Sequence, residues 1–473
     1  MGSKSAFLVF FTLIFAGLFL FFSSPILVKL SFFVNFIVLW IFTYYNIYIE
    51  KRFSPFLSVY LVFNLLFFIV APIVQIDSIV SGYMESGKFI QKFPFEENIC
   101  IRANLYLLVF HIIFFISYLK FNEKTDSLPD NHYYHSYKNS PVILTGLFVL
   151  TILIVLINLE TIIFQYQNEF YKEVEATSTS SYLIVQKFLF FIPMFGIILS
   201  YFYLQNNKQK NTNFYFVVFY LVFFLGITLM LKNPLTEKRN ALGPIYITLI
   251  FIFFKKYIDT NFKTVRFMFL SMILLFPLLT IITHSRYSLS QMITKPHTII
   301  KNIEYLHVTD AFNSLHYDAY PNFLATIDFH DKKEVVVGKQ LLGSVFFFVP
   351  RSIWKEKPET TGFKVGNYLI DKYKFNFDNL SNPYISEGYI NFGLIGILLF
   401  PIALAYFFSR MVLWVRSQDY LKVIFAFYTA IYLMYFLRGD LTNGIAYLVA
   451  FWLAIIFVPK SMFALLKYYE RKN

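Results

Sequence analysis

The stretch PFLSVYLVFNLLFFIVAPIVQI, residues 55–76, runs for 22 residues without a charged side chain. A helix needs about 20 mostly apolar residues to cross the hydrocarbon core of a bilayer. The whole chain of 473 residues is 57% apolar and only 15% charged, whereas soluble domains average roughly 25% charged residues. The sequence therefore predicts an all-α polytopic integral membrane protein rather than a soluble globule.

Similar apolar runs recur on both sides of this stretch and predict about 12 transmembrane helices. Residues 1–283 would contain helices 1 to 9, residues 384–473 would contain helices 10 to 12, and residues 284–383 would form a large loop between them. Within this loop, 297–307 has the apolar spacing of a short helix, and 341–350 (LLGSVFFFVP) is too short to span and is typical of an interfacial segment. The predicted spans are 6–22, 26–49, 55–76, 99–119, 141–163, 182–204, 214–231, 241–258, 267–283, 384–408, 419–437 and 444–466.

The distribution of basic residues predicts the orientation of these helices. If the N-terminus is cytoplasmic, the short cytoplasmic segments hold 17 Lys and Arg residues and the short outer loops hold 7. Because Lys and Arg are retained on the cytoplasmic side, we expect both termini in the cytoplasm and the loop 284–383 on the outer face. A loop of this length is where function is expected.

Composition and motifs exclude several classes of chemistry. The net charge is +13, but the basic residues lie between apolar runs, which argues against a nucleic-acid partner. The single cysteine, Cys100, excludes an intramolecular disulfide and a cysteine-based metal centre. The chain has no P-loop, GxGxxG or HExxH motif, and the histidines of the large loop match no metal-ligand spacing. No metal and no nucleotide cofactor are therefore expected.

Five arginines lie at or beyond the predicted outer membrane face. An arginine side chain there can snorkel or pair with a carboxylate. Its guanidinium group can also bind a phosphate group bidentately, and a lipid diphosphate presents its charge at this depth. The group consists of Arg102, Arg239, Arg286, Arg351 and Arg438.

Two further positions could act as an acid or a base. Glu387 lies in SNPYISEGYINFGLIG, 381–396, close to a predicted helix start. Its carboxylate can be favoured there by the helix dipole, or it can be a general base whose pKa neighbouring arginines adjust. His316 precedes Asp318 by two residues, which could form an acid–base pair or simply a solvated loop.

Three stretches of the sequence, in their order along the chain, resemble motifs of the bacterial O-antigen polymerases of the Wzy type, which polymerise oligosaccharide repeat units. PRSIWKEKPETTG, 350–362, is similar to the Pro-Arg-x-x-Trp-x-x-Lys-Pro pattern of that family. SEGYINFGLIG, 386–396, is similar to its Gly-Glu-x-Tyr-x-Asn-Phe-Gly stretch, although Ser386 replaces the first glycine. Arg438-Gly439-Asp440 is the third match, and TEKRNA, 236–241, resembles the Ser-Arg-Gly-Ala turn of the family less closely.

The resemblance implies a GT-C-like glycosyltransferase in the bacterial inner membrane that needs neither metal nor nucleotide. Such enzymes transfer the growing glycan from undecaprenyl diphosphate to a new lipid-linked repeat unit at the periplasmic face, surrounded by membrane lipids, and a chain-length regulator is an expected partner. Glu387 would be the general base, with His316 as the alternative. Arg351 and Arg239 would also act in catalysis. The diphosphate would be bound by Arg239, Arg286, Arg351 and Arg438.

Two other functions are compatible with the same topology. An O-antigen ligase uses the same donor with a different acceptor, and that family is expected to use a histidine of the large loop. A lipid-linked oligosaccharide flippase or another transporter commonly contains internal repeats and a site at the membrane midplane. The absence of a recognisable repeat and the long loop on one side favour the polymerase.

Overall fold

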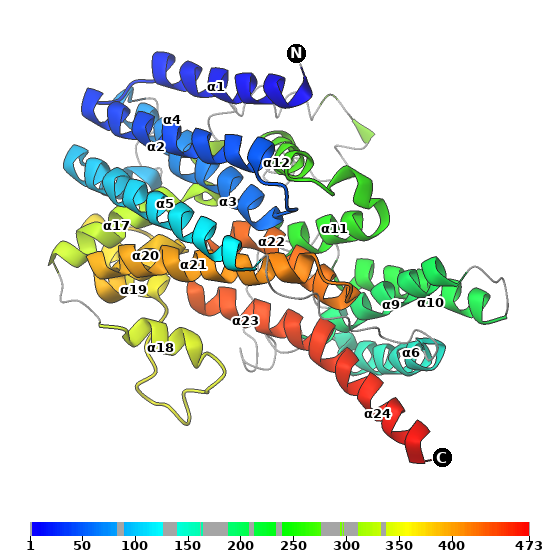
Figure 1. The fold of residues 1–473 in the computed structure, drawn as a ribbon. Coiled ribbons are helices and arrows are strands. Elements are labelled where there is room, and N and C mark those ends of the chain that lie inside the picture. Colours follow the sequence, from blue (N-terminus) through cyan, green and yellow to red (C-terminus); the bar gives the residue numbers. More distant parts are fainter. Residues whose placement is uncertain are drawn as a thin grey trace.

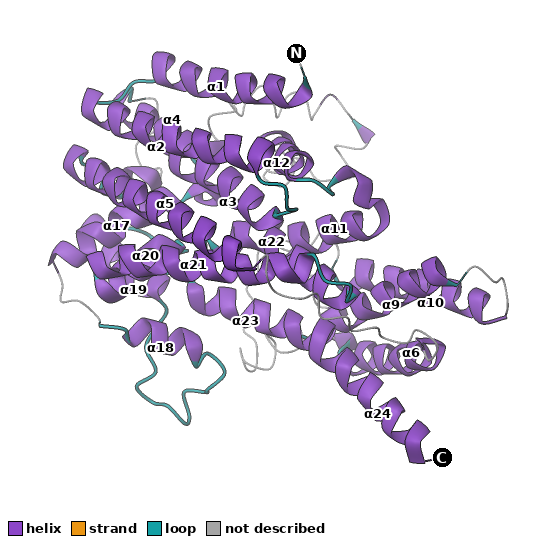
Figure 2. Cartoon of the chain, viewed as in Figure 1, coloured by secondary structure: helices purple, strands orange, loops and turns teal. Residues whose placement is uncertain are grey.

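The structure is a computed structural model, and every regular element that it describes is helical (Figure 2). This confirms the prediction of an all-α chain. The described residues are 2–82, 89–125, 140–160, 162–163, 188–207, 212–232, 239–275, 294–295, 297, 311–332 and 337–472.

Nine helical stretches in the described residues are long and apolar enough to cross a membrane. This confirms a polytopic membrane protein. The stretches are Ser3–Phe21 (α1), Ile26–Ile49 (α2, Ile26–Tyr44, continued by η1, Tyr45–Ile49), Pro55–Val80 (α3, Pro55–Leu65; η2, Leu66–Val70; α4, Ala71–Val80), Glu97–Glu123 (within α5, Glu97–Thr125), Ser140–Ile157 (α6), Leu189–Asn206 (η5, Leu189–Phe191; α9, Ile192–Asn206), Thr212–Leu231 (α10), Leu394–Val415 (α21) and Leu441–Tyr469 (α23, Leu441–Trp452; η9, Leu453–Phe457; α24, Val458–Lys472).

Three of the predicted spans correspond to shorter helices. The span predicted at 241–258 is α11, Arg239–Phe254, of 16 residues, and the span predicted at 419–437 is α22, Tyr420–Phe436, of 17 residues. The span predicted at 267–283 begins in α12, Asn261–Leu270, and η7, Ser271–Leu275, and its remainder lies outside the described residues.

The predicted span 384–408 is wrong as a single helix, because two helices meet inside it. Helix α20, Tyr384–Phe392, ends at Gly393, whose φ of 58° and ψ of −136° form a combination that glycine adopts and residues with a side chain avoid. A Cβ atom on Gly396 would collide with the backbone carbonyl of Gly388, so the middle of α20 and the start of α21 pack backbone against backbone. Helix α20 therefore lies outside the membrane-spanning stretch Leu394–Val415.

The stretch 55–76 lies at the centre of the helix bundle. All of the 18-residue apolar window in Pro55–Val80 is buried, against 22% of the window in Ser3–Phe21. A helix that is apolar on every side is stable only when either other helices or lipid surround it. In this chain α3 packs against α12 and α22, so protein rather than lipid surrounds it.

The described part of the large loop closes one end of the bundle (Figure 1). It contains η8, Leu315–Tyr317; α17, Ala319–Lys332; α18, Lys339–Val345; and α19, Thr361–Tyr373. Helix α17 is buried along most of its length and packs against α5, α19 and α20. The segment 341–350 starts in α18 and ends in a turn that exposes Phe346 and Phe348. The predicted short helix at 297–307 lies outside the described residues, apart from residue 297.

Candidate functional site

The three stretches that carry the family resemblance each contribute one side chain to the same buried cluster. Thr361 begins α19, Glu387 lies in the first turn of α20, and Asp440 caps the start of α23. The Thr361 hydroxyl is hydrogen-bonded to Glu387 Oε1 and lies 3.2 Å from Asp440 Oδ2. All three residues are at most 5% exposed, so the cluster is buried.

Helix capping explains why these residues meet. Asp440 Oδ1 accepts the backbone N–H of Thr442 at 2.9 Å, and its Oδ2 accepts the N–H of Gly362 at 3.2 Å. The N–H of Leu441, in the first turn of α23, is 3.2 Å from Glu387 Oε1. The first N–H groups of a helix have no partner within the helix and favour negative charge. The two carboxyl groups therefore hold the starts of α19 and α23 together.

Burial sets the ionisation state of Glu387. Its removal from water, followed by the negative charge of Asp440, raises the pKa of Glu387 to about 8. No arginine is among the groups with the largest effect on this pKa. At neutral pH Glu387 is mostly protonated. The Thr361 hydroxyl donates toward Glu387 Oε1 and also lies within hydrogen-bond distance of Asp440 Oδ2. Glu387 Oε2 has no hydrogen-bond partner among the described residues.

A second polar cluster forms around Arg438. Its Nε donates to Asp318 Oδ1 at 2.9 Å, and its Nη2 donates to the carbonyl oxygen of Leu315 at 2.5 Å. Asp318 also accepts from the Ser381 hydroxyl at 2.8 Å. His316 lies half-buried on the same turn, η8, directly after Leu315. This arrangement orients the guanidinium group of Arg438 through a carboxylate that is only 4% exposed.

Two segments connect the clusters. Arg438 precedes Asp440 by two residues, and Ser381 precedes Glu387 by six. The backbone N–H of Tyr384 donates to the carbonyl oxygen of Leu437 at 2.9 Å, which binds these two segments to each other. The fold thus places Glu387, Arg438 and His316 in one region at the end of the bundle that α17, α19 and α20 cover.

The described contacts do not join the other arginines of the outer face to either cluster. Arg351 is exposed in the loop between α18 and α19, where its Nη1 donates to the carbonyl oxygen of Lys357 at 2.7 Å. Arg239 starts α11, but its side chain is not described, and Arg286 lies outside the described residues. Arg102 pairs with Asp331 at 2.5 Å. Of the five arginines, only Arg438 belongs to one of the two clusters among the described residues.

The sequence alone does not mark every member of the clusters. Thr361 is one of two adjacent threonines in ETTG, 359–362, and nothing in that pattern indicates a contact with Glu387. Asp440 directly before an apolar run is typical of a helix cap, and this signal could have identified it. Asp318, which the sequence suggests as a partner of His316, instead pairs with Arg438.

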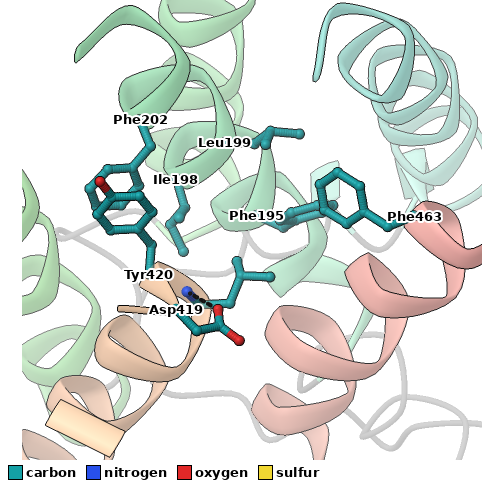
Figure 3. A pocket seen from close by; sticks show the side chains of 8 residues that line it. Phe195, Ile198, Leu199, Phe202, Asp419, Tyr420 and Phe463 are labelled. Atoms are coloured by element: carbon teal, nitrogen blue, oxygen red, sulfur yellow. Dashed lines mark hydrogen bonds between the residues drawn. The ribbon is translucent and has the colours of Figure 1, made fainter. Parts of the chain in front are cut away.

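No group of three or more His, Cys, Asp or Glu side chains that could hold a metal ion occurs among the described residues. An apolar void near Asp419 and Phe463 has a volume of about 10 Å³ (Figure 3). This is close to the minimum for a single water molecule, so the void is a packing defect rather than a substrate site.

Comparisons with family models, with curated proteins and with solved structures give no match for this chain. The function of this chain is therefore inferred from its site and from the motifs quoted above.

Proposed function

We propose that this protein is a glycosyltransferase that polymerises lipid-linked oligosaccharide repeat units at the periplasmic face of the bacterial inner membrane. One observation carries the proposal. The stretches 350–362, 386–396 and 438–440, which resemble the polymerase motifs and are far apart in sequence, meet in the cluster of Thr361, Glu387 and Asp440. Groups that act on the same substrate must lie close together, and this requirement would explain why the three motifs converge.

In this proposal Arg438 binds the diphosphate of the undecaprenyl-linked donor. Its Nε and Nη2 are engaged by Asp318 and Leu315, and its Nη1 makes no hydrogen bond with a described residue. Negative charge grows on the diphosphate as its bond to the anomeric carbon breaks, and a preoriented cation stabilises that charge most in the transition state. Arg351, Arg239 and Arg286 are the further candidates for this role.

The acceptor is the terminal sugar of a new lipid-linked repeat unit, whose hydroxyl oxygen forms the new bond to the anomeric carbon. Its proton passes to the carboxylate form of Glu387, or to His316 as the alternative base. A pKa of about 8 makes Glu387 a stronger base than an ordinary carboxylate once it is ionised. The GT-C-like fold, the cytoplasmic location of both termini and a chain-length regulator as partner belong to the same proposal.

Deletion of the gene in its native host, followed by electrophoresis of the surface polysaccharide, tests this function. If the long ladder collapses to material with one repeat unit, polymerisation alone is lost. If the single repeat unit also disappears, the polymerase proposal is refuted and a ligase or a flippase takes its place.

Complementation of the deletion with site variants tests the residue roles. Arg438→Lys and Glu387→Gln should restore insertion and abundance but not the ladder, whereas Lys355→Ala, at an exposed position of the α18–α19 loop, should restore both. Arg351→Ala tests whether the exposed arginine reaches the donor. A normal ladder with that variant would remove Arg351 from the diphosphate site.

A further inference from the structure

A cation-rich cavity of about 500 Å³ lies where α1 begins, η1 ends and α12 begins. Figure 1 places this position at the N-terminal end of α1, away from the end of the bundle that α17, α19 and α20 cover. Cavities that bind small ligands have volumes of roughly 300–1,000 Å³. Five cationic side chains line the cavity, against two carboxylates, Glu50 and Asp259: Lys4, Lys51, Arg52, Lys263 and Arg266.

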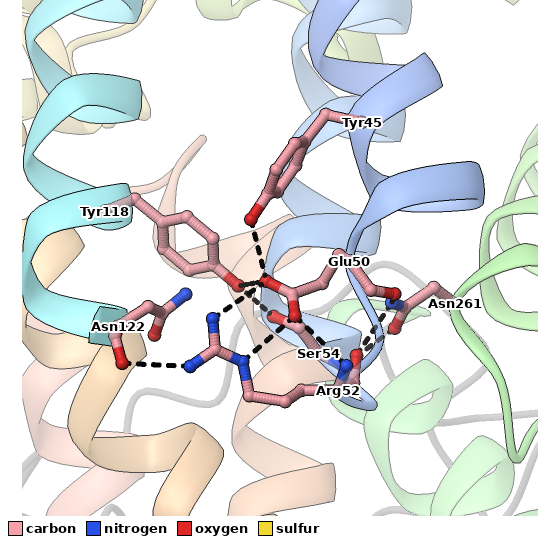
Figure 4. Close-up of polar contacts among 7 residues, drawn as sticks. All are labelled: Tyr45, Glu50, Arg52, Ser54, Tyr118, Asn122 and Asn261. Carbon is pink, nitrogen blue, oxygen red and sulfur yellow. Dashed lines mark hydrogen bonds and ion pairs between the residues drawn. The ribbon is translucent and has the colours of Figure 1, made fainter. Parts of the chain in front are cut away.

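Hydrogen bonds among buried groups hold the wall of this cavity in place (Figure 4). Asn261 Oδ1 accepts the backbone N–H of Ser54 at 2.7 Å, and its Nδ2 donates to the carbonyl oxygen of Arg52 at 2.8 Å. Arg52 Nε donates to Glu50 Oε1 at 2.9 Å, and the Tyr118 hydroxyl donates to Ser54 Oγ at 2.8 Å. The loop 50–54 is therefore fixed to the first residue of α12, and the cavity is preformed.

Two of the five cations are paired with carboxylates. Arg52 pairs with Glu50 at 2.9 Å, and Lys263 pairs with Asp259 at 2.7 Å. Lys4 Nζ only donates to the carbonyl oxygen of Ile47, at 3.0 Å.

Lys51 and Arg266 are exposed and form no hydrogen bond or ion pair with another described residue. The guanidinium group of Arg266 lies 5.4 Å from the centre of the Phe262 ring. Three positive charges thus line one cavity without an anionic partner.

The cavity lies at a membrane surface, because three candidate spans begin or end at its rim: Ser3–Phe21, Ile26–Ile49 and Pro55–Val80. At this depth the anions of a bilayer are the phosphate groups of lipid headgroups. Arginine binds phosphate through paired donors, and lysine binds it as a point charge.

We propose that this cavity binds the phosphate group of an anionic phospholipid headgroup. Lys51, Arg266 and Lys4 contact the phosphate oxygens, and the paired residues Arg52 and Lys263 form the wall. The acyl chains extend along the apolar surface of α1, which exposes Leu13 and Leu20. This site is at the other end of the bundle from Glu387, so it does not depend on the proposed polymerase activity.

The test measures the thermal unfolding midpoint of the full-length protein in a neutral detergent. Phosphatidylglycerol, phosphatidylcholine with the same acyl chains, and inorganic phosphate are each titrated. A ligand that binds only the folded state raises the midpoint as its concentration increases. We expect phosphatidylglycerol to raise the midpoint, phosphatidylcholine to have little effect, and added salt to weaken the response.

The double variant K51A/R266A should weaken the apparent affinity for phosphatidylglycerol at least about tenfold, because each charge-assisted hydrogen bond contributes roughly that factor. K467A/R410A is the matched control. It also removes one exposed lysine and one exposed arginine, and Arg410 lies 5.1 Å from the ring centre of Tyr406. K51R/R266K keeps both charges and should retain most of the affinity.

Equal responses of the wild-type protein to the two phospholipids and to phosphate would overturn the proposal. So would an unchanged affinity in K51A/R266A. A response to inorganic phosphate that matches phosphatidylglycerol and is lost in K51A/R266A would support the phosphate site but assign it to a soluble ligand. The wild-type comparison of the lipids stands even if a variant fails to fold.

Discussion

Replacement of Glu387 by glutamine should change how the stability of this protein depends on pH. The buried carboxyl group has a pKa of about 8, against an ordinary value of 4.5. Between these values the folded protein binds a proton that the unfolded chain releases, so folding stability decreases as pH rises. Below pH 4.5 this group does not change the free energy of unfolding with pH. Above pH 8 its stabilising contribution is lost completely.

The size of this loss follows from the shift in pKa. Each pH unit between the two pKa values costs about 1.4 kcal/mol of unfolding free energy. Between pH 5 and pH 8 the wild-type protein should lose about 3–4 kcal/mol through this group alone. Glu387→Gln carries no titratable proton and lacks this contribution, so the variant should gain in stability relative to the wild type as pH rises.

Thermal unfolding in detergent, followed by tryptophan fluorescence at pH 5, 6, 7 and 8, measures this difference. Only the difference between the wild type and E387Q is interpreted, because the other titrating groups are common to both. Glu356→Gln at an exposed position is the control and should run parallel to the wild type at every pH. A constant difference between the wild type and E387Q across this range would refute the assignment of a buried, protonated Glu387.

Three other perturbations have defined outcomes. Arg438→Lys keeps a charge beside Asp318 but loses the second hydrogen bond, so the rate of chain extension measured with isolated membranes should fall about 10²-fold; an unchanged rate would exclude Arg438 from the diphosphate site. Gly396→Ala places a methyl group against the backbone of Gly388 and should lower the unfolding free energy by about 1–3 kcal/mol, visible as a lower unfolding midpoint. Burial opposes ionisation of Asp328, but hydrogen bonds from Lys372 and its neighbours lower its pKa to about 2. The stabilisation from Asp328 should therefore persist above pH 4 and disappear as pH falls toward 2, and Asp328→Asn should abolish this acid-dependent part of the unfolding curve.

The membrane character of this protein follows from its sequence alone. Stretches such as 55–76 are too long and too apolar for a soluble fold, and hydrogen bonds within a helix satisfy the backbone wherever lipid replaces water. Local patterns could also have identified two helix starts, because Asp440 and Thr360 are residues that favour capping positions and cap α23 and α19 in the structure. These features depend on neighbours in the chain, so the sequence contains them directly.

Only the tertiary structure decides which polar residues meet. The break at Gly393 separates Glu387 from the membrane-spanning helix α21, although hydropathy merges the two because both sides of the break are apolar. The contacts of Glu387 with Thr361 and Asp440 join residues that are 26 and 53 positions away. Burial of all three then raises the pKa of Glu387. Such contacts arise from the packing of distant helix ends, and the loss of water that sets the ionisation state exists only after the chain has folded.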